Sequence, residues 1–114
     1  MSAGEVGSAI ETYGKVQTPS TVTLPGSGGT PVEISISGDE CQVSLSSATA
    51  YKWTIADSAT NAAANFSGDD FANVPADGVF NLGVAGYGQN NAMNLYVLAQ
   101  GATSGQISFW KHNN

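Results

Sequence analysis

The chain of 114 residues and 11.6 kDa has room for one domain with one hydrophobic core, because a chain of this size buries roughly two-thirds of its unfolded surface on folding. The formal net charge is −6, with three lysines and no arginine, which argues against binding to nucleic-acid phosphates or to an anionic membrane surface. No apolar run approaches the ~20 residues of a membrane-spanning helix. The first residues lack the basic start and apolar segment of a secretory signal, so export by that route is not expected.

The low charge content has a consequence for the surface. Charged residues make up 11% of the chain and glycine occurs 14 times, a mixture that favours short strands joined by turns. The surface must then consist mainly of Ser, Thr, Asn and Gln. Such a surface tolerates contact with another protein, because few hydrated charges must lose their water.

Residues 1–20 are predicted to form an N-terminal arm outside the core, and residues 21–114 a single β domain. The larger apolar residues of the arm are spaced for at most about two helical turns. Two interpretations stay open: a frayed terminus, or a segment that becomes ordered on a neighbouring subunit. The apolar residues concerned are Val6, Ile10, Tyr13 and Val16.

Period-two alternation then predicts four strands separated by turns. A short turn at Gly38–Glu40 predicts that the second and third of them form a hairpin. Successive strands with turns between them favour a sandwich or a barrel. The predicted strands are Thr21–Leu24, Val32–Ser37, Cys41–Ser46 and Tyr51–Ala56.

The stretch Asp57–Asp70 interrupts this alternation with small and polar residues. It predicts a long exposed loop with at most one helical turn. After it, Phe71–Val74 is predicted to be a short edge strand ended by Pro75, because proline cannot donate a hydrogen bond to a sheet. Further strands are predicted at Val79–Val84 and Gln106–Lys111.

The stretch Met93–Gln100 differs from the other runs because it is apolar on both faces. Successive residues of a strand point to opposite sides, so this strand must be covered twice, by the core and by a second layer or a partner chain. It is the predicted centre of an all-β domain, an antiparallel β-sandwich or jelly-roll-like barrel with an extended N-terminal arm. The residues that supply both faces are Leu95, Tyr96, Val97 and Leu98.

No catalytic, metal or cofactor site is predicted. His112, the single histidine, lies near the C-terminus and is interpreted as solvated rather than as a base. Cys41 has no second cysteine to pair with and is interpreted as a small buried hydrophobe. The acidic pairs Asp39–Glu40 and Asp69–Asp70 lack the spacing of a calcium loop and are interpreted as solvated turn residues.

Two other patterns have simpler explanations. The glycine-rich stretches Gly26–Gly29 and Gly86–Gly88 are interpreted as turns, because neither has the lysine that a phosphate-binding loop needs. The aromatic residues could form a platform for stacking sugars, although packing in a core or an interface is their commoner use. They are Tyr51, Trp53, Tyr87, Tyr96 and Trp110.

The run FANVPADGVFNLGV at Phe71–Val84, followed by LYVLAQGATSGQISFWK at Leu95–Lys111, resembles small bacteriophage head-decoration (cement) proteins. The likeness extends back to VTLPGSGGTPVEISISG at Val22–Gly38. The resemblance implies a non-enzymatic virion protein, made in the host cytoplasm, that binds the major capsid protein on the outer capsid surface. There it would bridge neighbouring shell subunits as a homo-oligomer, with a trimer favoured.

The expected partner contacts come from the arm, the first strand, the second face of the central strand and the last strand. They are Val6, Ile10, Tyr13, Val22, Leu24, Tyr96, Leu98 and Trp110. The alternative function is a carbohydrate-binding or adhesin-like module on a tail fibre, in which aromatic residues and loop acids would hold a glycan.

Overall fold

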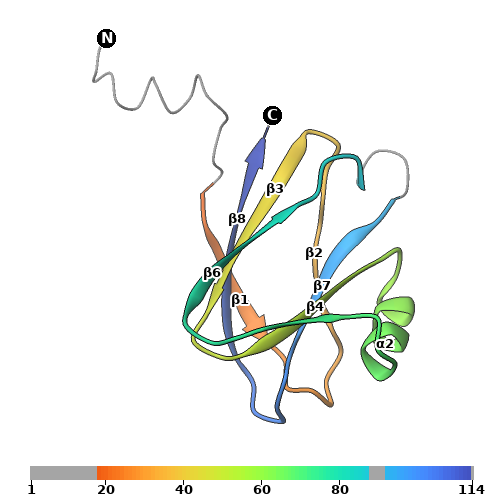
Figure 1. The fold of residues 1–114 in the computed structure, drawn as a ribbon, viewed down its shortest axis with the longest axis vertical. Coiled ribbons are helices and arrows are strands. Elements are labelled where there is room, and N and C mark those ends of the chain that lie inside the picture. The colour runs from red at the N-terminus through yellow and green to blue at the C-terminus, as the bar shows by residue number, and fades with distance from the viewer. Residues whose placement is uncertain (1–17, 88–91, 114) are drawn as a thin grey trace.

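The computed structural model describes residues 18–87 and 92–113, which form a β-sandwich with one short helix in this part of the chain (Figure 1). Two four-stranded antiparallel sheets pack together, in the orders β1-β8-β3-β6 and β2-β7-β4-β5. The predicted all-β fold is confirmed. The elements are β1 (Ser20–Leu24), β2 (Val32–Ile34), β3 (Glu40–Ser47), β4 (Tyr51–Ala56), α2 (Ala59–Ser67), β5 (Ala72–Val74), β6 (Gly78–Gly83), β7 (Asn94–Ala99) and β8 (Gly105–Asn113).

The chain crosses between the two sheets at every connection except the one from β4 through α2 to β5. The predicted hairpin between the second and third strands is therefore wrong. β2 pairs with β7, whereas β3 pairs with β6 and β8. Alternation of apolar and polar residues identifies the side chains that face the core. It does not show to which of the two sheets a strand belongs, because both sheets have a face toward the core.

The inner faces of the two sheets meet in one hydrophobic core. Both sheets contribute fully buried aliphatic side chains, and the partly buried rings of Trp53 and Phe80 lie 5.8 Å apart. Burial of such side chains is the main stabilising contribution in a domain of this size. The largest fully buried aliphatic residues are Leu24, Ile34, Val43, Leu45, Val84, Leu95, Val97 and Ile107.

β7 is covered on both faces, as its sequence predicts. Leu95 and Val97 point into the core, whereas Tyr96 and Leu98 point to the outer side and are 4% and 3% exposed. Their cover is α2, whose Ala62 and Phe66 pack with them in a second cluster. The second layer thus comes from this chain itself, so the strand needs no partner to cover it.

The predicted loop at Asp57–Asp70 is wrong, because its middle forms α2. Ser58 caps the helix: its side-chain oxygen accepts a hydrogen bond from the Asn61 amide at 3.1 Å. Ala62 and Phe66, four residues apart, place one apolar face on the sheet. No helix in the described parts of the chain has the length and apolarity to cross a membrane.

The loops at one end of the sandwich pack closely. Ser27 donates a backbone hydrogen bond to the Gly101 carbonyl at 2.8 Å, and a side chain at Gly26 would collide with the Ala102 backbone. We expect Gly26→Ala to lower the free energy of unfolding by about 1–3 kcal/mol, because neither loop can move without breaking this contact. Gly28 has open space around it, so Gly28→Ala is the matched control and should stay within about 1 kcal/mol of the parent. Urea unfolding of both variants tests this, and equal losses would contradict it.

The hydroxyl group of Tyr51 is buried and has no hydrogen-bond partner among the residues that the structure describes, and burial raises the pKa of Tyr51 to about 12. The folded state therefore holds this proton more tightly than the unfolded state, in which the pKa is about 10. The contribution of this pKa difference to the free energy of unfolding is fully present below pH 10 and is lost as the pH rises through about 12.

We expect Tyr51→Phe to leave stability near pH 8 unchanged or to raise it by about 1 kcal/mol, because the phenylalanine ring leaves no unpaired hydroxyl group. Between pH 8 and pH 12 the free energy of unfolding of Tyr51→Phe should fall by about 2 kcal/mol less than that of the parent. Burial also raises the pKa of Tyr96, but that contribution is common to both proteins. Urea unfolding at both pH values measures the difference, and parallel pH profiles would contradict the prediction.

Candidate functional site

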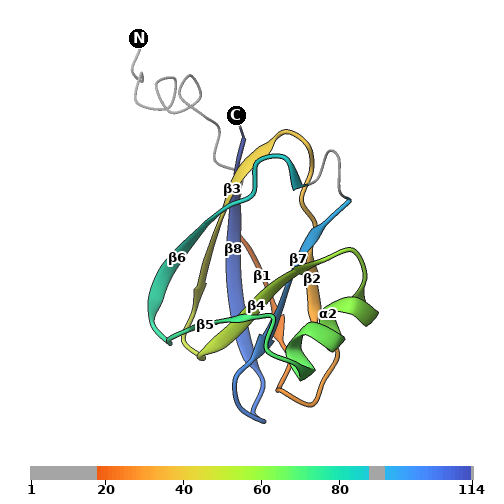
Figure 2. The same cartoon turned by 45° about the vertical axis from the view of Figure 1, so that its right-hand side comes forward.

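The outer face of the β1-β8-β3-β6 sheet lies on the opposite side of the sandwich from α2 (Figure 2). Within the described residues no helix or strand covers it. We call it the open face, and its side chains alternate with those that enter the core. They are Thr21, Thr23, Gln42, Ser44, Ser46, Val79, Asn81, Gln106, Ser108, Trp110 and His112.

The open face carries no lysine, arginine, aspartate or glutamate, although the whole chain has a net charge of −6. Exposed sheet surfaces commonly carry charges that discourage association. Here hydroxyl and amide groups surround one large aromatic side chain, Trp110, which is partly buried opposite Ser44. Such a surface loses little hydration energy when another polar surface covers it.

Hydrogen bonds between side chains link neighbouring strands of the open face. Ser44 donates to the Asn81 side-chain oxygen on β6 at 2.6 Å and lies 3.0 Å from Nε2 of His112 on β8. The hydroxyl groups of Thr21 and Ser108 join β1 to β8 at 2.9 Å. These contacts fix side-chain positions before any partner arrives, which reduces the entropy lost on binding.

The interpretation of His112 as a solvated terminal residue is wrong, because it lies partly buried in β8 and contacts Ser44. This pair is not arranged for nucleophilic catalysis. The Ser44 hydroxyl group donates its proton to the Asn81 side-chain oxygen and not to His112. Ser44 is also 1% exposed, so a substrate could not reach its oxygen.

Within residues 18–87 and 92–113, no charged side chain belongs to the open face. Glu40, interpreted as a solvated turn residue, is 3% exposed, accepts a hydrogen bond from the Ser37 amide and lies 3.7 Å from the Lys111 ammonium. Cys41 is only partly buried, because a bulge in β3 follows Glu40, and its Sγ donates to the His112 carbonyl at 3.4 Å. No group of three metal-ligating side chains occurs among the residues described.

The eight expected contact residues fall into different environments. Leu24, Tyr96 and Leu98 are buried and present no surface to a partner, because the core or α2 covers them. Val22 is partly buried against the core. Trp110 lies on the open face. The remaining three, Val6, Ile10 and Tyr13, lie outside the described residues.

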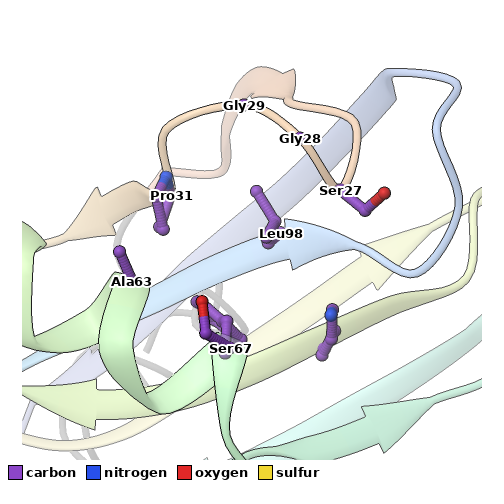
Figure 3. Close-up of a pocket in the computed structure, with 9 residues that line it drawn as sticks. Ser27, Gly28, Gly29, Pro31, Ala63, Ser67 and Leu98 are labelled. Atoms are coloured by element: carbon purple, nitrogen blue, oxygen red, sulfur yellow. The ribbon is translucent and has the colours of Figure 1, made fainter.

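A pocket lies between α2 and the loop that joins β1 to β2 (Figure 3). Leu98 lies beneath the loop, and Ala63 and Ser67 of α2 form the opposite wall. Lys52 also lines it, and its ammonium lies 4.7 Å from the centre of the Phe71 ring. The volume, about 210 Å³, is below the range of roughly 300–1,000 Å³ typical of small-molecule sites. We therefore assign this pocket no ligand.

A second hollow of about 240 Å³ lies beside β4 and is lined by Trp53, Ile55 and Phe71. It is also small for a ligand site. Three of the five aromatic residues that could have formed a sugar platform pack inside the molecule: Tyr51 and Trp53 enter the core and Tyr96 lies under α2. Tyr87, which follows β6, is exposed. Trp110 is the large aromatic side chain of the open face.

Comparison with known protein families, characterised proteins and solved structures finds no match for this chain. Its function therefore has to be argued from the open face and from the sequence.

Proposed function

We propose that this chain is a non-catalytic structural protein that attaches to the outside of a bacteriophage capsid by docking the open face on the major capsid protein. The observation that carries the proposal is the uncharged face around Trp110, with its preformed hydrogen bonds. The resemblance of Phe71–Val84 and Leu95–Lys111 to head-decoration proteins supports the choice of partner.

The chemistry of the open face supports a protein partner. Interface centres are depleted in charged residues, and tryptophan is over-represented among the residues that dominate binding energy. Ser, Thr, Asn and Gln around Trp110 can exchange hydrogen bonds with water for hydrogen bonds with a partner. No bond is made or broken, and the chain would stabilise the shell by contacting neighbouring capsid subunits.

Repetition on the capsid strengthens such attachment. A capsid presents the same site many times in symmetric positions. Two docked copies that contact each other, or one copy that contacts two capsid subunits, bind more tightly than a single contact allows. A face of moderate affinity is therefore sufficient.

Co-sedimentation tests this function directly. Purified chain is mixed with empty heads assembled from the major capsid protein of the same virus and centrifuged. We expect saturable binding with a fixed ratio to capsid subunits and a higher temperature of head disruption. Absence of binding to intact heads would contradict the proposal.

A carbohydrate-binding module is the second candidate, and one observation favours it. Trp110 is flanked on the open face by hydroxyl and amide groups, which can bind the hydroxyl groups of a sugar while the ring stacks on its apolar side. A glycan array separates the two functions. Glycan binding that disappears in Trp110→Ala, together with no binding to heads, would favour the module.

A further inference from the structure

β6 is the outermost strand of the β1-β8-β3-β6 sheet, and no described strand pairs with its free side. Its course along the border of the sheet is visible in Figure 2. A free edge exposes backbone N–H and C=O groups that can pair with another strand. Proteins usually block such edges with proline, charge or short length.

The other three edge strands carry these blocking features. β1 is bracketed by Pro19 and Pro25. β2 has three residues, one of them the charged Glu33. β5 also has three residues and is followed by Pro75. These edges are poor templates for strand addition.

β6 has none of them. Its six residues, GVFNLG, include no proline and no charged side chain. Val79 is 61% exposed, the most exposed large hydrophobic side chain among the residues described. On the other side of the strand, Phe80 and Leu82 are only partly buried where the sandwich ends. The strand thus offers an unpaired backbone with apolar groups on both sides.

We propose that β6 pairs with β6 of a second copy, antiparallel and about a two-fold axis at Asn81, so that the two four-stranded sheets become one continuous sheet. The inference does not depend on what the open face binds. In this pairing Phe80 lies opposite Leu82 of the other copy on the core side. On the open-face side Val79 lies opposite a glycine, Gly83, which leaves room for it.

The choice of axis follows from the side chains. A shift by a single residue would set core-side against outer-side residues and is excluded by the alternation of the strands. An axis at Phe80 would place the Asn81 amide opposite Val79 and leave Leu82 opposite Gly78. An axis at Asn81 pairs apolar with apolar and amide with amide, and no like charges meet across it.

The mass of the full-length chain in solution is the first test. Sedimentation velocity and native mass spectrometry at micromolar concentration should give a dimer of twice the 11.6 kDa chain, or an assembly of such dimers. A monomer over the whole concentration range would overturn the proposal. The trimer implied by the family resemblance would overturn it as well, because a two-fold edge pairing does not generate a trimer.

A disulfide at the axis tests the site. In a Cys41→Ser background, Asn81→Cys places one thiol on each copy at a separation of about 4.5–5.5 Å between Cα atoms, which suits a disulfide. Mild oxidation should cross-link this variant. Thr23→Cys, exposed on the opposite edge strand of the same sheet, is the matched control and should stay uncross-linked. The reverse pattern would overturn the assignment to β6.

A charge exchange tests the register. Asn81→Lys and Asn81→Asp each place two like charges at the axis, so each alone should dimerise about tenfold or more weakly than the parent. An equal mixture should restore a heterodimer, visible by mass. Circular dichroism verifies that both variants are folded. Failure of the two variants to pair in the mixture would overturn the register. If dimers are lost only when residues 1–17 are deleted, the contact belongs to the N-terminal segment instead of β6.

Discussion

Trp110→Ala is expected to weaken attachment to capsids about 30-fold, the equivalent of about 2 kcal/mol for a large aromatic residue at the centre of an interface. The physical reason is the loss of its apolar area, which hydroxyl and amide groups surround and which a partner would cover. Co-sedimentation with empty heads over a range of chain concentrations measures the change.

Three further variants make this result specific. Gln106→Ala removes an exposed side chain near the border of the same face and should change affinity less than about threefold. Ser108→Lys puts a charge on the open face and should also impair docking, because the charge would have to lose its water. Thr60→Lys adds the same charge on α2 and should bind like the parent. If folded Trp110→Ala binds capsids as tightly as the parent, the open face is not the surface that docks on the capsid.

Leu98→Ala is expected to lower the free energy of unfolding by about 2–5 kcal/mol, the usual range for a buried leucine. Leu98 is 3% exposed between β7 and α2, so the truncation leaves a cavity beneath the helix. Chemical denaturation followed by circular dichroism measures the loss.

The control is Thr60→Ala, at an exposed position of α2 outside the proposed β6 contact, which should cost less than about 1 kcal/mol. The pair separates two roles for the outer face of β7. If α2 is its cover, Leu98→Ala destabilises the isolated subunit. If Leu98→Ala instead leaves stability unchanged but impairs assembly, the outer face of β7 contacts a partner chain.

The strands of this protein were largely predictable from sequence. Alternation in Cys41–Ser46 and Tyr51–Ala56 marks a side that enters the core, and Pro75 marks the end of β5. The doubly apolar run around Leu95 correctly predicted a strand covered twice. These features depend on neighbours along the chain, which a sequence shows directly.

The features that were missed depend on other causes. A capping residue at Ser58 and a four-residue spacing between Ala62 and Phe66 were local signals for α2, but the small polar residues around them favoured a loop. The contact of Ser44 with His112 joins residues 68 positions apart and exists only because β3 pairs with β8. Strand pairing and register are long-range properties, so periodicity could not reveal the open face.

The place of β8 between β1 and β3 also governs when the protein can fold. Among the described strands, the last one, β8, holds the first one, β1, in its sheet, so that sheet cannot close until residues 105–113 have been synthesised. Contacts between such distant segments make folding slow, because a long stretch of chain must be ordered before they form. During that interval the apolar side of each earlier strand is open to solvent and to other nascent chains, and rapid synthesis of many copies would favour their aggregation.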